Sequence, residues 1–367
     1  MRATNAIDFW RGVALVMIFI NHIPGNAFSY FTLRNVAIVD AAELFVFLAG
    51  WSLYHATGGV SRPHTAPRIG FRLVTRAIEL YRAHLVTSVM AFALCAGMAL
   101  ATGNALYLDW NGAGPMFQDP PRAIVGLVTL SFQLGFFNIL PLYVVLLLMA
   151  PILIVVARVS PLAGLTVSLL FYSLALLTRL IPPAWPAYER WYFNPLSWQL
   201  LLLMGYLAAR FSETFRSLPK LAAELVPAAI TILLFGLVCI RFGLFPDPID
   251  VPEPRMLFLF DKTYLSPARL ISIAALVLAF SGAYNRLCPW IGPFDEFLCS
   301  LGRNSLAVFS VGSLLSLVGQ FIRFSGDGGF LIDLGLVASG IGALGLTAWF
   351  VEWRERLPAG LTRQRSS

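Results

Sequence analysis

The chain is dominated by long apolar stretches that follow one another with little polar sequence between them. A helix that crosses a membrane needs about 20 mostly apolar residues, and ten segments come close to this length. They lie near residues 6–27, 38–56, 83–103, 138–158, 161–181, 195–210, 222–244, 266–283, 301–323 and 331–351. The pattern predicts an all-α polytopic membrane protein with about ten transmembrane helices, forming a single integral domain over residues 1–367.

Composition excludes an ordinary soluble protein. Hydrophobic residues make up 58% of the 367 positions and charged residues only 12%, about half the share that soluble domains carry. So few charges cannot cover a water-soluble protein of this size. The segment 122–133 is too short to cross a membrane, so we expect a surface or re-entrant helix there.

Positive charge gathers in three segments of the chain. The net charge is +7, from 26 Lys and Arg against 19 Asp and Glu. Such an excess is typical of cytoplasmic loops in a membrane protein, and we expect no nucleic-acid partner. All three segments fall on one side if both termini are cytoplasmic. They contain Arg62, Arg68, Arg72, Arg76 and Arg82, then Arg210, Arg216 and Lys220, and finally Arg354, Arg356, Arg363 and Arg365.

Motifs for resident cofactors are missing from the sequence. The four cysteines form no CxxC pair, so we expect neither a disulfide framework nor a metal site. There is no P-loop motif and no Gly-rich dinucleotide fingerprint after a strand. The first apolar stretch contains Arg11 and His22 and has no small-residue cleavage pattern, so it is not expected to be a cleavable signal.

The first span carries ionisable side chains, which are costly inside a membrane. In DFWRGVALVMIFINHIPGN, Arg11, Leu15, Ile18 and His22 share one helical face. Helix geometry places His22 about 16 Å from Arg11 along the axis, with Arg11 toward the cytoplasm. The alternative is that Arg11 anchors the helix end by snorkelling and that His22 is an interfacial residue.

The second span begins with two acidic residues, in VDAAELFVFLAG. This span returns from the side where the first one ended, so Glu43 is expected at the depth of His22. A carboxylate beside a histidine orients its tautomer and stabilises its cation, as in a general base. His22, Glu43, Asp40 and Arg11 are therefore the predicted catalytic residues. The alternatives are that Asp40 is a helix N-cap and that Glu43 is a first-turn acid.

Arg68, Arg72 and Arg76 recur every four residues in RIGFRLVTRAIELYRAHL. On a helix they form a basic stripe at the cytoplasmic surface. One interpretation is that they set the topology and contact anionic lipid. The other is that they bind the phosphates of a nucleotide-bearing donor, because the guanidinium fork pairs with phosphate.

Further polar side chains fall at span ends and suggest an acceptor site. Asn194 and Trp198 stand in WYFNPLSWQLLLLMG, after a run of Trp and Tyr residues. Such a run is typical of the aromatic belt at a membrane interface, although aromatic rings also stack on sugars. Arg34 and Asn35 are additional acceptor-site candidates, and they are candidates for stabilising the oxyanion of an acyl transfer.

At these motifs the sequence resembles the OpgC-type membrane proteins, which are succinyltransferases of osmoregulated periplasmic glucans. The likeness continues through ILPLYVVLLLMAP, WYFNPLSWQLLLLMG, DKTYLSPARL and LGRNSLAVFS, so it covers nearly the whole chain. The wider relatives are membrane acyltransferases of polysaccharides that share an Arg-x10-His pattern in the first span. Arg11 and His22 match that pattern. The sequence differs from the family pattern at Ala37–Val39 and at Ala49, near the expected acceptor side.

The resemblance implies a ten-helix enzyme of the bacterial inner membrane. Its co-substrate would be a cytoplasmic acyl-coenzyme A, succinyl-coenzyme A by likeness, and its acceptor a hydroxyl of a periplasmic glucan. His22 matches the family's proposed catalytic histidine, and Arg11 matches its partner. The arginines before the third span resemble the basic segment assigned to the donor. Because donor and His22 would lie at different depths, we expect a buried polar tunnel through the bundle.

Two other classes of function are compatible with the same residues. A secondary transporter or flippase would also carry buried Arg, His and Glu side chains, although the sequence has no detectable inverted repeat. A non-catalytic partner of a glucan synthase is the third interpretation. Nothing in the sequence predicts an oligomeric state.

Overall fold

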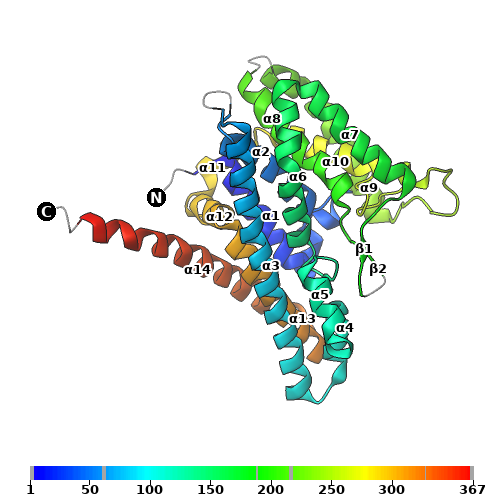
Figure 1. Cartoon of the computed structure of the whole chain (residues 1–367), viewed down its shortest axis with the longest axis vertical. Coiled ribbons are helices and arrows are strands. Elements are labelled where there is room, and N and C mark those ends of the chain that lie inside the picture. The colour runs from blue at the N-terminus through cyan, green and yellow to red at the C-terminus, as the bar shows by residue number, and fades with distance from the viewer. Residues whose placement is uncertain (1–3, 60–62, 187–188, 215–217, 327, 364–367) are drawn as a thin grey trace. The chain divides into compact units, whose positions relative to one another are not determined.

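The computed structural model describes residues 4–59, 63–186, 189–214, 218–326 and 328–363. Within these ranges the chain is helical apart from loops and two short strands, β1 (Pro183–Ala184) and β2 (Glu189–Arg190), which pair antiparallel (Figure 1). The expected all-α class is confirmed. Arg62, Arg216 and Arg365, which belong to the predicted basic segments, lie outside the described residues.

Six of the described helices are long and apolar enough to cross a membrane. They are α3 (Ala66–Thr102), α6 (Ile139–Val159), α7 (Pro161–Thr178), α9 (Leu218–Phe242), α13 (Ser305–Ser325) and α14 (Phe330–Arg363). The number rises to seven if α10 (Pro267–Phe280) and α11 (Ala283–Ile291) are counted as one bent span. These helices indicate a membrane protein, while the number of about ten and the polar tunnel stay predictions.

The remaining predicted spans also fall on helices, but on shorter or more polar ones. They are α1 (Ala6–Asn21), α2 (Ala41–Ala56), α8 (Pro195–Thr214) and α10. The predicted span 301–323 is divided between α12 (Pro293–Arg303) and α13. The short segment 122–133 overlaps the nine-residue helix α5 (Pro120–Val128), which begins two residues before it.

The helix α3 is much longer than the predicted span 83–103. Its 37 residues extend for about 55 Å, whereas the hydrocarbon core of a bilayer is about 30 Å thick. The basic stripe and the apolar span therefore belong to one continuous helix, whose first turns reach beyond the hydrocarbon core.

The helices group into two compact units. Unit 1 consists of Met1–Thr32 and Gly282–Ser367, and unit 2 of Leu33–Ser281. Unit 1 contains α1, η1 (Ala27–Phe31), α11, α12, α13 and α14. Unit 2 contains η2 (Leu33–Asn35), α2, α3, η3 (Ala105–Gly112), α4 (Gly114–Gln118), α5, α6, α7, β1, β2, α8, α9, η4 (Arg255–Leu257) and α10.

In unit 1, the amino-terminal helix α1 packs against α12 and α13 from the other end of the chain. A Cβ at Gly12 would collide with the backbone of Leu298, and one at Gly302 with the backbone of Asp8. These glycines let the backbones of α1 and α12 touch, as small residues do between membrane helices.

In unit 2, α2 and α8 also pack backbone to backbone. Gly50 on α2 and Gly205 on α8 each lie against the main chain of the other helix, with no room for a Cβ. Tyr54, near the end of α2, donates to Glu213, near the end of α8, at 2.8 Å. The two helices therefore run parallel. The helices α6 and α7 pack on α8, and α3 packs on α6.

Candidate functional site

His22 is the C-cap residue of α1 in unit 1. Its backbone N–H donates to the carbonyl of Ile18, and its own carbonyl accepts from Gln320 Nε2 at 2.6 Å. Its ring lies edge-on to the ring of Phe309 on α13, with the centroids 6.5 Å apart. Leu15 and Ile18 are buried, so the helical face that carries His22 points into the unit.

Arg11 lies on the same face of α1, toward the other end of the helix. Its guanidinium donates to Ser305 Oγ at the start of α13. It also lies 3.9 Å from the carboxylate of Asp8, one turn earlier. Asp8 in turn accepts from Asn5, the N-cap of α1, at 2.7 Å. Because α13 contacts α1 at Arg11 through its first residue and at His22 through Gln320 near its end, α1 and α13 run parallel.

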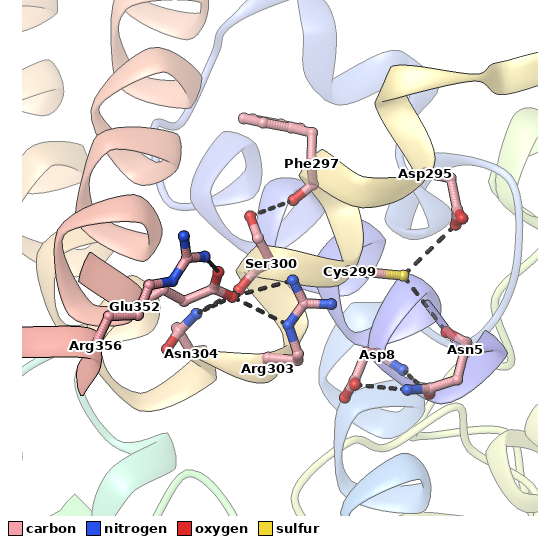
Figure 2. Close-up of polar contacts among 10 residues, drawn as sticks. All are labelled: Asn5, Asp8, Asp295, Phe297, Cys299, Ser300, Arg303, Asn304, Glu352 and Arg356. Atoms are coloured by element: carbon pink, nitrogen blue, oxygen red, sulfur yellow. Dashed lines mark hydrogen bonds and ion pairs between the residues drawn. The ribbon is translucent and has the colours of Figure 1, made fainter. Parts of the chain in front are cut away.

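The junction between α12 and α13 presents Ser305 to Arg11. Figure 2 shows Arg303 and Asn304 converging on Glu352 of α14, at 3.0 and 3.2 Å. The side chain of Asn304 also donates to the carbonyl of Ser300 at 2.9 Å. These contacts fix the break between the two helices.

Asp40 and Glu43 form a capping box at the start of α2. Asp40 accepts from the N–H of Ala42 at 2.8 Å, and Glu43 accepts from the N–H of Asp40 at 3.1 Å. The N-cap and first-turn interpretations are thus both confirmed. Each carboxylate also has a cationic partner in unit 2, Lys262 for Asp40 and Arg269 for Glu43. The Nε of Arg269 donates to Glu43 Oε1 at 2.6 Å, and Glu43 is 0% exposed.

The loop before α10 brings two of the predicted acceptor-site residues, Asn194 and Trp198, to this same place. The indole N–H of Trp198 donates to the carbonyl of Lys262 at 3.1 Å. The backbone N–H of Asn194 donates to the carbonyl of Thr263 at 3.0 Å. The ammonium of Lys262 lies 5.6 Å from the centre of the Tyr192 ring.

Burial separates structural from accessible side chains at this loop. Asn194 and Trp198 are both 0% exposed, whereas Tyr192 is 48% exposed. Burial opposes the charge of Lys262, but the nearby carboxylates of Asp40 and Glu43 outweigh it and raise the pKa of Lys262. The ammonium therefore stays charged beside the exposed ring.

Arg34 and Asn35 are placed elsewhere in unit 2. They lie on η2, which contacts α9. Arg34 is exposed and Asn35 is half-buried.

Arg68, Arg72 and Arg76 lie on the exposed face of α3, while Ile69 and Leu73 occupy its buried face. The predicted basic stripe is therefore open to its surroundings. The three members are not equivalent in charge. Arg76 pairs with Glu79, one turn later on α3, at 2.6 Å, so its charge is compensated locally.

Arg158 joins the start of this stripe from the end of α6. It donates to the carbonyls of Thr57 and His64, each at 2.6 Å. Burial lowers the pKa of the His64 imidazole, and the charges of Arg68, Arg72 and Arg158 lower it further. The positive charges of the three arginines therefore add up at the His64 imidazole, just before α3 begins.

Comparison with known families covers both units. A sequence profile described as OpgC protein matches residues 2–356. The chain belongs to the OpgC family. No curated protein and no solved structure matches it. OpgC membership indicates a membrane acyltransferase-like role in glucan modification.

In this OpgC-family chain the predicted site residues other than Arg34 and Asn35 fall into three groups. Arg11 and His22 lie together in unit 1. Around the Lys262 loop in unit 2 lie Asp40, Glu43, Asn194 and Trp198. At the other end of α2, Arg68 and Arg72 gather with Arg158 near His64. The expected pairing of His22 with Glu43 joins two different units and stays a prediction.

Sequence reasoning missed the partners of these residues in the OpgC-family chain. They are Lys262, Arg269, Arg158 and Gln320. A signal existed for two of them, because a charge inside a membrane span requires a partner. Arg158 lies at the end of the predicted span 138–158, and Arg269 lies within 266–283.

No group of three or more His, Cys, Asp or Glu side chains is arranged to hold a metal ion within the described part of the OpgC-family chain. The four cysteines are free thiols. The predicted site residues therefore offer an imidazole, two paired carboxylates and several guanidinium groups for chemistry.

Proposed function

We propose that this protein is a membrane O-acyltransferase of the bacterial inner membrane. It moves an acyl group, succinyl by family likeness, from cytoplasmic acyl-coenzyme A to a hydroxyl of a periplasmic glucan. The observation that carries the proposal is the Arg11–His22 helix within an OpgC-family chain. Its arginine and its histidine lie on one inward face, and α13 holds both of them.

In the proposed reaction, His22 is the general base. The glucan hydroxyl oxygen attacks the thioester carbonyl while the imidazole takes the hydroxyl proton. Collapse of the tetrahedral intermediate breaks the C–S bond, and the imidazolium returns the proton to the departing thiolate. The products are a glucan ester and free coenzyme A. A route through a transient acyl-histidine would use the same residue as nucleophile.

The acceptor is proposed to meet the Lys262 loop. Tyr192 offers an exposed ring for stacking on a sugar, and Lys262 offers a charge beside it. Asn194 and Trp198 contribute by holding this loop, because both are fully buried. Arg34 and Asn35 stay candidates for oxyanion stabilisation.

The direct test is covalent transfer of label. Purified protein, given labelled succinyl-coenzyme A and osmoregulated periplasmic glucan, is expected to produce labelled glucan. Glucan or label that crosses a reconstituted vesicle without ester formation would favour the transporter or flippase. Esterification that requires an added glucan synthase would favour the non-catalytic partner. Mass spectrometry of glucans from cells with and without the gene gives the same answer in vivo.

The donor phosphates are proposed to bind at Arg68 and Arg72, beside Arg158, with Arg76 extending the stripe. Phosphate requires cations whose charge is not already neutralised, and the guanidinium group suits it best. Arg158 is bound to two main-chain carbonyls, which leaves its positive charge in place. Arg76 contributes less, because Glu79 lies 2.6 Å away.

The variant Arg68→Gln/Arg72→Gln is expected to raise the KM for succinyl-coenzyme A by about tenfold or more, with kcat nearly unchanged. Charge-assisted contacts of this kind contribute about 1.5–3 kcal/mol each, and binding that is equal in ground and transition states affects KM alone. Arg76→Gln is the matched control and should change KM less. Donor titration on correctly inserted protein measures both, and an unchanged KM would favour lipid contact.

Helix directions support the proposed ten spans. The parallel helices α2 and α8 require an odd number of crossings between them, and α3, α6 and α7 provide three. The parallel helices α1 and α13 also require an odd number. Four crossings come from α3, α6, α7 and α9, so α2, α8 and α10 must add one or three. If all three cross, the chain has ten spans and both termini lie on one side.

A reporter fused after Ser367 is expected to be active in the cytoplasm and inactive in the periplasm. The reason is the even number of spans together with the preference of arginine-rich segments for the cytoplasm. A second fusion after Asp250, in the loop that follows α9, should show the opposite pattern. A periplasmic signal at Ser367 would contradict the topology and the side assigned to the donor.

A further inference from the structure

The backbone after His22 is held by side chains from α13. Gln320 donates to the carbonyl of His22 at 2.6 Å, and Arg323 donates to the carbonyl of Gly25 at 2.8 Å. The carbonyls at the end of a helix have no partner within the helix. These two side chains therefore supply the hydrogen-bond donors that the helix α1 itself cannot supply beyond its end.

Asp333 on α14 is the third side chain that holds this turn. We call Gln320, Arg323 and Asp333 together the clamp. Its carboxylate accepts from the backbone N–H of Ala27 at 2.8 Å and forms an ion pair with Arg323. Asp333 is only 3% exposed. A buried carboxylate in a membrane helix is costly without a partner. The ion pair therefore keeps α13 and α14 in register, while both of its residues hydrogen-bond to the turn after α1.

Packing leaves the turn little freedom. Ile23 is 1% exposed, and a Cβ at Gly319 would lie 3.0 Å from its Cδ1. Gly25 has φ +79°, a backbone conformation that favours glycine, and a Cβ there would lie 3.2 Å from the guanidinium of Arg323. Asn26 closes the helix end by donating to the carbonyl of Ile20 in α1 and to the carbonyl of Ile23 just after it, each at 2.7 Å.

We propose that Gln320, Arg323 and Asp333 are positioning residues, which hold His22 in its reactive place by fixing the main chain from His22 to Ala27. This inference rests on the proposed role of His22 as general base. A base must lie within hydrogen-bond reach of the proton it takes, and a misplacement of about 1 Å can cost about 100-fold in rate. His22 stands at a helix end, where helices fray, so α1 by itself does not supply that precision.

The same helix α13 also fixes Arg11, through Ser305 at its first position. Both ends of the Arg11–His22 face are thus held by one rigid helix, α13. Functional groups are placed most accurately when packing and hydrogen bonds on rigid elements lock them. The clamp accounts for an ion pair and a buried amide that the proposed chemistry itself does not use.

The test compares Gln320→Leu with Ser316→Ala. Leu keeps the approximate size of Gln and removes the donor to the His22 carbonyl. Ser316 is buried one turn earlier on α13 and donates to the carbonyl of Ser313 within that helix. Gln320→Leu is expected to lower kcat about 10–100-fold, to leave the KM for succinyl-coenzyme A unchanged, and to shift the pH profile of kcat. Ser316→Ala should keep the wild-type kcat, KM and pH profile.

Arg323 offers a second, graded comparison. Arg323→Lys keeps a cation for Asp333 and should lose less kcat than Arg323→Met. Insertion and the thermal midpoint are measured for every variant. If Gln320→Leu and Arg323→Met are less stable but keep the wild-type kcat and pH profile, the clamp is merely structural and the inference is overturned. Absence of transfer by the wild type, or full activity of His22→Ala, would instead reject the proposed function itself.

Discussion

Replacing His22 with Ala is expected to lower the rate of acyl transfer by about 10²–10⁴-fold, the usual cost of losing a general base. The protein should still insert normally, because the clamp contacts the main chain at this position. The carbonyl that accepts from Gln320 is kept in the variant. Turnover of labelled succinyl-coenzyme A by the purified protein, together with the amount of inserted protein, measures the two effects separately.

His55→Ala is the matched control for this substitution. His55 also lies near the end of a helix, but it is exposed and faces Glu213 at 3.5 Å. Loss of its imidazole should change turnover by less than about twofold, because no step of the reaction is assigned to it. Near-normal turnover in His22→Ala, or an equal loss in both variants, would remove His22 from the role of base.

Much of the fold could be predicted because the length of an apolar run is a local property. The predicted spans 138–158 and 161–181 agree with α6 and α7 within a few residues. Boundaries failed where a tertiary contact ends a helix. The break between α12 and α13 depends on Glu352, which Asn304 and Arg303 reach from 48 and 49 positions away. Nothing near Asn304 in the sequence indicates that partner.

The candidate site was predictable in its members but not in their partners. Asp40 and Glu43 follow a local capping pattern, so their place on α2 could be inferred. Arg269 lies 226 positions from Glu43, and only folding brings the two together. Trp198 illustrates a second limit, because the side chain of an aromatic residue at a span end can point outward to a ligand or inward to the core. It points inward: Trp198 is buried, with its ring centroid 4.7 Å from that of Phe193, so it supports the acceptor loop from within.

Removing one member of the Glu43–Arg269 pair is expected to destabilise the protein strongly, by about 3–5 kcal/mol, because the other charge is left buried without its partner. Glu43 is 0% exposed and Arg269 is 8% exposed, so water cannot replace the lost contact. Thermal unfolding in detergent should show a large fall in Tm for Glu43→Gln and for Arg269→Gln. Arg76→Ala is the control, because it breaks an exposed pair with Glu79 that contributes less than about 1 kcal/mol.

The double variant Glu43→Gln/Arg269→Gln then separates the two roles that Glu43 could have. With both charges removed, it should be markedly more stable than the sum of the single changes predicts, since the pair acts as one unit. If this protein folds and keeps the wild-type kcat, the carboxylate serves the architecture of unit 2 and another group orients His22. If it folds, binds donor with the wild-type KM and loses kcat by 10-fold or more, the carboxylate acts on the reaction, as the spacing of the first two spans predicts. Strictly additive destabilisation would contradict the pairing, because independent residues would then carry the two effects.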